Sequence, residues 1–206
     1  MEYRTLAVQG AFEFFPEVFP DDRGRFTAPF QESSFVDAVG HPFPAVRQVN
    51  CSTSRRRVLR GVHFTRTPPG VAKYVYCAHG RVVDMVVDLR VGSPTFGAWD
   101  AVTIDATVRP SGVYFPVGVG HAFLALSDDT VMSYVLSGEY VADQEHAVSP
   151  LDPAIALPVT AEREVTLSAR DRAAPTLAEA QALGLLPVYE ECLEIENSFR
   201  SSVRIP

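Results

Sequence analysis

The middle of the chain, residues 47–136, consists of short hydrophobic runs separated by small and polar residues. The runs recur roughly every ten residues, a spacing typical of all-β sandwiches and barrels. Between them stand residues with turn chemistry, such as His79-Gly80, Gly92-Ser93-Pro94 and Ser127-Asp128-Asp129. Short antiparallel strands with this spacing predict a jelly roll. The predicted strands cover residues 73–78, 82–89, 99–104, 112–115, 121–126 and 131–136.

The N-terminal segment alternates in the same way, with apolar residues at Leu6, Val8, Phe12, Phe14 and Val18. The pattern predicts a strand over about residues 5–19 that stands apart from the main group. Such a strand can pair with its own sheet or with the edge of a partner's sheet. We therefore expect a homodimer, and one arrangement would exchange this strand between the subunits.

Helical signals are few. Thr176 and Glu179 have the spacing of a capping box, and the run that follows closes at Gly184, which predicts a short helix near the C-terminus. Residues 33–39, closed by Gly40, are a second candidate. From about Cys192 onward the chain mixes charged and isolated apolar residues, a pattern open to a helix, a dimer contact or a frayed tail. We interpret residues 172–206 as a helical extension of a single 1–206 domain.

Composition narrows the class of protein. A net charge of −7 and a pI near 5.2 argue against a general nucleic-acid or membrane-surface binder, because both need a positive field. Residues 1–20 contain neither a signal-peptide core nor an apolar span long enough to cross a membrane. Three widely spaced cysteines fit reduced thiols better than a disulfide framework. We therefore expect a cytoplasmic location.

A basic segment runs from Arg47 to Lys73 and contains no Asp or Glu. Arginine forks bind phosphate oxygens in pairs, so a diphosphate is a natural ligand for such a segment. The triplet Arg55-Arg56-Arg57 is equally typical of a solvated basic loop. Arg60 differs, because it lies on the predicted strand that enters the barrel. Lys73 is the only lysine in the chain, although arginine is common in it.

Two histidines are candidates for chemistry. His63 lies in the run Leu59–Phe64, where strict alternation would place Gly61 and His63 on one face. His121 ends the segment Pro116-Val-Gly-Val-Gly-His121, which matches the second cupin motif, PxGxxH. A metal-binding cupin also needs an HxH motif in its first segment, and no HxH occurs in this chain. The sequence therefore disfavours a metal site and predicts no cofactor.

Taken in order, several segments of the chain resemble the dTDP-4-dehydrorhamnose 3,5-epimerase family from Leu6 to about Pro187. The resemblance implies a cupin-type jelly roll, usually dimeric, that binds a dTDP-4-keto-6-deoxyhexose inside the barrel and epimerises it. The segments that carry it are Asp22-Arg23-Gly24-Arg25-Phe26, Gln48–Ser52, Leu59–Phe64, Ala72-Lys73, Asp88–Gly97, Pro116–Phe123, Leu151-Asp152-Pro153 and Leu167–Asp171.

The resemblance also implies roles for individual residues. His63 would be the base, Asp171 its carboxylate partner, Tyr134 the opposing acid, and Lys73 the group beside the substrate carbonyl. Without the resemblance, Tyr134 would be interpreted as a barrel-lining aromatic, and a lone histidine as a structural residue. The family also implies seven substrate-binding residues, namely Arg23, Phe26, Gln48, Asn50, Arg60, His121 and Tyr140, of which Arg23 and Phe26 would reach across the dimer.

Some positions depart from the family pattern. Many 3,5-epimerases have a Glu where this chain has Ala28 and a Lys where it has Val135, and they have two adjacent tyrosines where it has Glu139-Tyr140. These departures resemble the branch that serves antibiotic deoxysugar pathways. They leave open whether carbon 3, carbon 5 or both are inverted. The other hypotheses are a metal-dependent cupin oxygenase and a sugar-nucleotide binder without catalytic activity.

Overall fold

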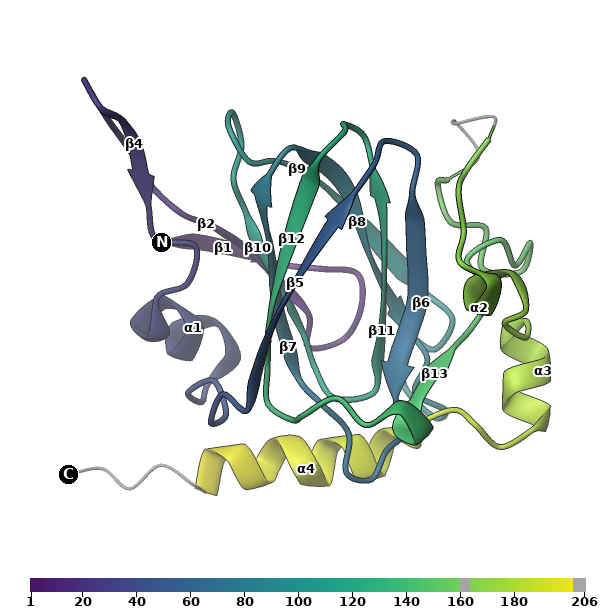
Figure 1. The fold of residues 1–206 in the computed structure, drawn as a ribbon. Helices are drawn as coiled ribbons and strands as arrows, with labels where there is room; N and C mark the ends of the chain where they lie inside the picture. Colours follow the sequence, from purple (N-terminus) through teal and green to yellow (C-terminus); the bar gives the residue numbers. More distant parts are fainter. Residues whose placement is uncertain (160–163, 202–206) are drawn as a thin grey trace.

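The computed structural model describes residues 1–159 and 164–201, which form two antiparallel sheets facing each other (Figure 1). The first sheet has six strands in the order β1 (Glu2–Thr5), β2 (Phe12–Phe15), β10 (Gly112–Phe115), β7 (Lys73–His79), β12 (Thr130–Leu136) and β5 (Gln48–Ser54). The second has five in the order β13 (Glu145–Ala147), β6 (Leu59–Thr65), β11 (Val119–Ala125), β8 (Arg81–Asp88) and β9 (Trp99–Asp105). The predicted all-β jelly roll is confirmed.

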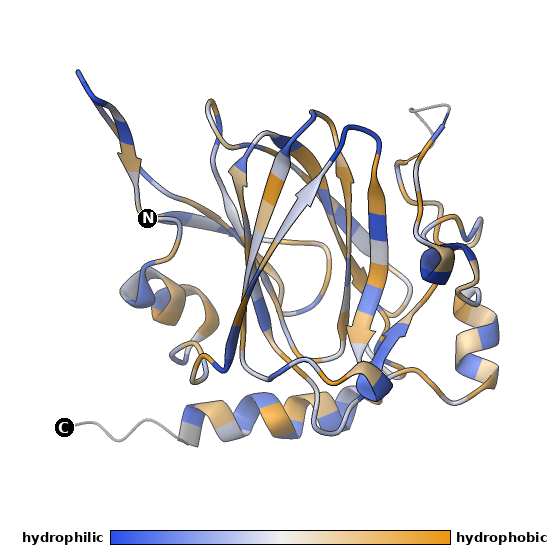
Figure 2. Cartoon of the chain, in the orientation of Figure 1, coloured by the Kyte–Doolittle hydropathy of each residue, from blue (hydrophilic) through white to orange (hydrophobic). Residues whose placement is uncertain are grey.

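Apolar side chains from both sheets meet in the barrel interior. Val75 and Phe115 of the first sheet pack with Val86 and Phe123 of the second, and each is at most 1% exposed. Burial of a side chain of this size contributes about 1.5–3 kcal/mol. Hydrophilic and hydrophobic residues alternate along the barrel strands because each strand has two faces (Figure 2).

The outer face of the five-stranded sheet is also covered. Met85, Val87 and Leu124 pack against Ile155 and Leu167 of the long segment that follows β13. α2 (Ala169–Arg172) and α3 (Leu177–Ala182) lie on this side of the barrel (Figure 1). β11 is consequently buried along its whole length. This packing brings α2 beside β6.

The N-terminal segment forms several elements rather than the single strand expected over residues 5–19. The chain turns at Gly10, whose φ is 82°, and β2 follows, pairing with β1 on one side and β10 on the other. Pro16, which has no N–H to donate, separates β2 from β3 (Val18–Asp21). β3 and β4 (Gly24–Thr27) form a hairpin that projects from the barrel (Figure 1).

Both predicted helices are present. Thr176 and Glu179 make the capping box that begins α3, and α1 (Glu32–Val39) ends at Gly40 with a φ of 85°. A 3₁₀ turn, η1 (Ala142–Gln144), precedes β13. The C-terminal stretch is a helix, α4 (Tyr189–Ser201), and residues 202–206 of the predicted extension lie outside the described residues. Glu196 attaches α4 to the barrel by accepting hydrogen bonds from the Tyr114 hydroxyl and the Val117 amide.

Candidate active site

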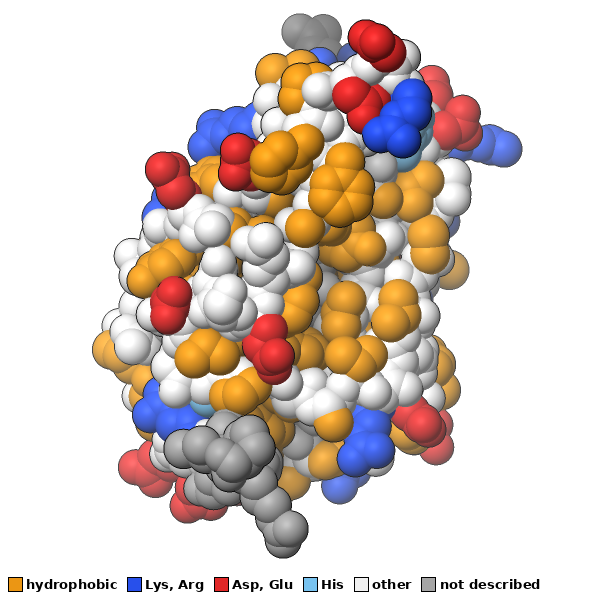
Figure 3. Space-filling view, turned by 90° about the vertical axis from the view of Figure 1, so that its left-hand side faces the viewer, with side chains coloured by type: hydrophobic (Ala, Val, Ile, Leu, Met, Phe, Trp, Pro, Cys, Tyr) orange, Lys and Arg blue, Asp and Glu red, His pale blue; other side chains and the backbone are white. Residues whose placement is uncertain are grey.

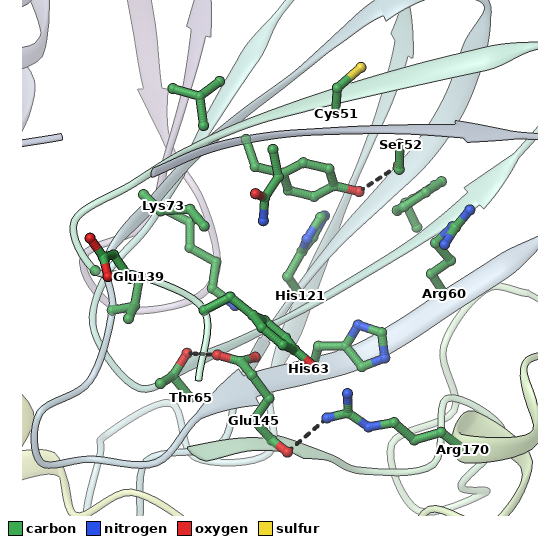
Figure 4. A pocket seen from close by; sticks show the side chains of 18 residues that line it. Cys51, Ser52, Arg60, His63, Thr65, Lys73, His121, Glu139, Glu145 and Arg170 are labelled. Atoms are coloured by element: carbon green, nitrogen blue, oxygen red, sulfur yellow. Dashed lines mark hydrogen bonds between the residues drawn. The ribbon is translucent and has the colours of Figure 1, made fainter. Parts of the chain in front are cut away.

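A cavity of about 500 Å³ opens between the two sheets (Figure 4). Both sheets supply its walls, and the loop after β12 and the start of α2 complete it. Seven predicted site residues line it, namely Asn50, Arg60, His63, Lys73, His121, Tyr134 and Tyr140, the last from the loop after β12. The structure therefore brings together most of the site that the sequence predicts.

His63 on β6 faces Asp171 on α2, and Nε2 lies 2.7 Å from Oδ1. Asp171 is 3% exposed. Burial raises the pKa of this carboxyl, but the hydrogen bond and charge of His63 outweigh that effect and hold the pKa below its usual range. A carboxylate can only accept hydrogen bonds, so Nε2 carries a proton, and whenever the ring is neutral the lone pair is on Nδ1. The neutral His63 ring therefore has the tautomer that a general base needs.

Local structure fixes both members of this pair. Ser168 caps α2 by accepting a hydrogen bond from the Asp171 amide, which holds Asp171 in the first turn. Opposite it, the register between β6 and β11 shifts so that His121 pairs with His63 while Phe123 pairs with Arg60. Strict alternation would put Arg60 and His63 on opposite faces, but this bulge lets both line the cavity.

Gly61 lies within that bulge and has a φ of 119°. A Cβ at this position would stand 2.5 Å from the Cα of Ala122 on the neighbouring strand. Both the backbone conformation and the close approach of the strands therefore require glycine here. The strict alternation that would place Gly61 and His63 on one face is therefore interrupted at this bulge.

Lys73 lies at the start of β7, 8% exposed, on the sheet opposite His63. The pKa of its ammonium lies below the usual value, mainly because of burial. The charge of Glu145 opposes this shift, and the charge of Arg170 adds to it. Glu145 is fixed by the Thr65 hydroxyl, 2.7 Å from Oε1, and its backbone carbonyl accepts from Arg170 at 2.8 Å (Figure 4). Among the described residues, no side chain makes a hydrogen bond or ion pair with Lys73, so its ammonium is available to a ligand.

Tyr134 projects from β12 of the six-stranded sheet, and its hydroxyl lies 3.1 Å from the Ser52 hydroxyl on β5. Burial raises the pKa of Tyr134 to about 12. The hydroxyl therefore keeps its proton throughout the neutral range, as a proton donor must. His63 and Tyr134 reach into one cavity from opposite sheets.

The remaining polar groups lie along the same cavity. The Arg60 guanidinium donates to the Ser54 hydroxyl and to the Thr53 carbonyl, both at 3.1 Å. Gln48 donates to Asn50 at 2.6 Å and accepts from the Tyr140 amide at 2.9 Å, so it supports the wall without being one of the lining residues.

The two residues expected to reach across a dimer lie elsewhere. Arg23 pairs with Asp21 at the tip of the β3–β4 hairpin, and the Phe26 ring, 66% exposed, lies against the Phe19 ring. Neither lines the cavity of its own chain.

Within residues 1–159 and 164–201, no cluster of three or more His, Cys, Asp or Glu side chains has the arrangement of a metal site. No helix in the same part of the chain is long and apolar enough to span a membrane.

Comparison with known proteins decides the family. The family model described as dTDP-4-dehydrorhamnose 3,5-epimerase matches residues 5–179. The chain belongs to this family. A relative from Mycolicibacterium smegmatis, named dTDP-4-dehydrorhamnose 3,5-epimerase, is 48% identical over 98% of this chain and 99% of its own. One from Streptomyces bikiniensis, named dTDP-4-dehydro-6-deoxyglucose 3-epimerase, is 46% identical over 95% of this chain and 98% of its own.

A solved structure agrees with the sequence comparisons. The 3'-monoepimerase ChmJ from Streptomyces bikiniensis, in complex with dTDP-quinovose, superposes with a TM-score of 0.91 at 45% identity, covering 97% of this chain and all of the other. The cupin-type jelly roll is thereby confirmed, and the chain is an isomerase of the dTDP-sugar epimerase class.

Sequence reasoning missed several residues that line the cavity of this epimerase. These residues are Ser52, Thr65, Glu145 and Arg170. Thr65 lies only two positions after His63 on β6, but Glu145 and Arg170 are distant in sequence, and the pairing of β13 with β6 brings Glu145 beside Thr65. Asp84 carried a usable signal, because it is a charged residue inside the apolar run Val82–Val87. A carboxylate in such a run needs a buried partner.

Proposed function

We propose that the protein inverts carbon 3, carbon 5 or both of a dTDP-4-keto-6-deoxyhexose by proton transfer, without a metal or redox cofactor. One observation carries this proposal: an Asp-oriented histidine and a protonated tyrosine reach into one cavity from opposite sheets, with a buried lysine beside them. A sugar ring between the sheets would present one face to His63 and the other to Tyr134. Such an arrangement suits proton removal and return with inversion.

In the proposed reaction, Nδ1 of His63 takes the proton from the carbon next to the ketone. The C–H electrons pass into the ring and the carbonyl oxygen becomes an enolate oxygen, which Lys73 stabilises with its positive charge. The hydroxyl proton of Tyr134 is then delivered to the same carbon from the far side. The resulting imidazolium and tyrosinate exchange protons with solvent before the next turnover, and Asp171 stabilises the imidazolium meanwhile.

Arg60 is proposed to bind the diphosphate, because it is a cation at the cavity wall with donors that a phosphate can engage. We expect Arg60→Ala to raise the KM about tenfold to a hundredfold, since a charge-assisted hydrogen bond contributes about 1.5–3 kcal/mol. The comparison is Arg55→Ala, an exposed arginine outside the cavity lining, in steady-state assays. Equal KM values for the two variants would show that Arg60 does not bind the diphosphate.

The activity itself is tested with dTDP-4-keto-6-deoxyglucose and EDTA-treated enzyme, followed by borohydride reduction of the ketone and analysis of the released sugars. The proposal expects epimeric sugars without added metal or nicotinamide. Loss of turnover in EDTA with recovery on one metal would favour the cupin oxygenase. Tight dTDP binding without any epimer would favour a silent binder. Relatives of both the 3,5- and the 3-epimerase type are about equally similar, so inversion at carbon 3 alone is the principal alternative.

We further propose that the chain is one domain that works as a cytoplasmic homodimer. β1 is an edge strand of the six-stranded sheet, and hydrophobic side chains spread over much of the face that carries the N-terminal strands (Figure 3). On the hairpin, Phe19 and Phe26 are 50% and 66% exposed. A partner would cover these rings, and the hairpin would bring Arg23 and Phe26 to the nucleotide in the partner's cavity. The three cysteines are free thiols, which fits a reducing compartment.

We expect Phe26→Asp to weaken the dimer and to raise the KM for the dTDP-sugar, because a carboxylate would replace an apolar contact at the interface. The matched control is Leu183→Asp, which alters a residue 67% exposed at the C-cap of α3, a helix on the opposite side of the barrel (Figure 1). Sedimentation velocity and steady-state kinetics are the measurements. A Phe26→Asp protein that stays dimeric with a wild-type KM would contradict the proposed role of the hairpin.

A further inference from the structure

A second His–Asp pair lies beneath the same cavity. His121 on β11 places Nε2 2.5 Å from Oδ1 of Asp84 on β8, and the Asp84 side chain is fully buried. His121 lines the cavity, pairs in register with His63, and packs edge-on against Tyr134 with 5.8 Å between ring centroids. The pair therefore adjoins both groups proposed to move protons.

The surroundings of the two aspartates differ. Asp171 lies in the first turn of α2 and has the positive charge of Arg170 close by. Asp84 has fewer partners. Its Oδ2 is buried without a hydrogen-bond partner, and among the described residues only His121 forms an ion pair or hydrogen bond with the Asp84 carboxylate. A net negative charge buried in this way would be costly.

We infer that Asp84 is a positioning residue that keeps an additional proton on the Asp84–His121 pair, so that His121 donates from Nδ1 to an oxygen of the bound sugar nucleotide. This inference rests on the proposed function. The pair is then net neutral, with one proton shared between Oδ1 and Nε2 and another on Nδ1. Within the described residues, Nδ1 has no hydrogen-bond partner, so its proton is available to a ligand.

The two His–Asp pairs would then have different roles. His63 presents a lone pair to the cavity and can act as a base. His121 presents an N–H and cannot compete for the substrate proton. The ionisable groups around the His121 pair are His63 from β6, Tyr134 from β12 and Cys77 from β7, with Arg60 further along the wall. None of them forms an ion pair with Asp84.

The charge state is measured on the ligand-free protein by ¹⁵N NMR of the histidine rings at pH 7.5. We expect neither ring nitrogen of wild-type His121 to show the shift of a free lone pair, because both hold or share a proton. In Asp84→Asn one of the two should show it. This measurement does not involve turnover, so it can fail while the epimerase proposal stands. A free lone pair on Nδ1 in the wild-type protein would overturn the inference.

Kinetics test whether Asp84 acts through His121. We expect Asp84→Asn to lower kcat/KM for the dTDP-sugar about tenfold to a hundredfold, and to have no further effect in a His121→Gln background. The matched control is Asp88→Asn, which alters a fully buried aspartate of the same strand that pairs with Arg90. This control should lower the melting temperature but leave the His121 spectrum unchanged. Additive losses in the Asp84–His121 double variant would assign Asp84 a purely structural role.

Discussion

Replacement of His63 by alanine is expected to lower turnover by at least about a hundredfold, the lower end of what a positioned general base contributes. Nε2 of His63 lies 2.7 Å from Oδ1 of the buried Asp171, which leaves Nδ1 as the nitrogen that can accept the substrate proton. Without it no enolate forms, so deuterium exchange from solvent into the substrate should be lost together with epimerisation. Binding of dTDP should be unchanged, since the pair lies where the sugar, not the nucleotide, is proposed to react.

Two further variants sharpen this result. Asp171→Asn should show a similar loss, because the amide can no longer stabilise the imidazolium. His79→Ala replaces an exposed histidine outside the cavity and should retain wild-type turnover. Exchange kinetics by proton NMR and dTDP affinity by calorimetry are the measurements. If His63→Ala weakened dTDP binding and left kcat unchanged, His63 would be a binding residue and the base would have to be sought elsewhere.

Replacement of Tyr134 by phenylalanine should separate the two halves of the reaction. His63 can still remove the proton, so substrate hydrogen should continue to exchange with solvent deuterium at the reacting carbon. Formation of the epimer should fall by about two to four orders of magnitude, the usual contribution of a positioned acid. Exchange without inversion is the expected signature.

Tyr76→Phe is the matched control for that variant. Tyr76 belongs to the adjacent strand β7 but does not line the cavity, so its hydroxyl should have no effect on either process. A Tyr134→Phe enzyme that forms the epimer at the wild-type rate would identify water or another residue as the donor. Tyr134 would then be a barrel-lining aromatic, as its position in a hydrophobic strand suggests on its own.

The sequence predicted those parts of the fold that depend on local chemistry. The strand that begins at Lys73 and the capping box of Thr176 and Glu179 depend on neighbouring residues, and both are present. The N-terminal segment was predicted less well, because alternation extends through Gly10 and Pro16, where the backbone turns. Pattern alone does not reveal how a strand is interrupted.

The site was predicted to a different extent. His63 and Asp171 lie 108 positions apart, so only the family resemblance could join them before the structure did. Arg60 and His63 share the cavity through a bulge that strict alternation does not predict. Asp84 was missed because its partner lies on an adjacent strand, 37 positions away.

The central claim is that this cavity removes and returns a proton beside the ketone. It is tested most directly by incubating the wild-type enzyme with dTDP-4-keto-6-deoxyglucose in deuterated water and following carbons 3 and 5 by proton NMR. The account predicts that each inverted carbon loses its proton signal as the epimer appears, which also identifies the carbons that react. Epimer that retains its original proton at the inverted carbon, or no loss of signal at either carbon, would contradict it.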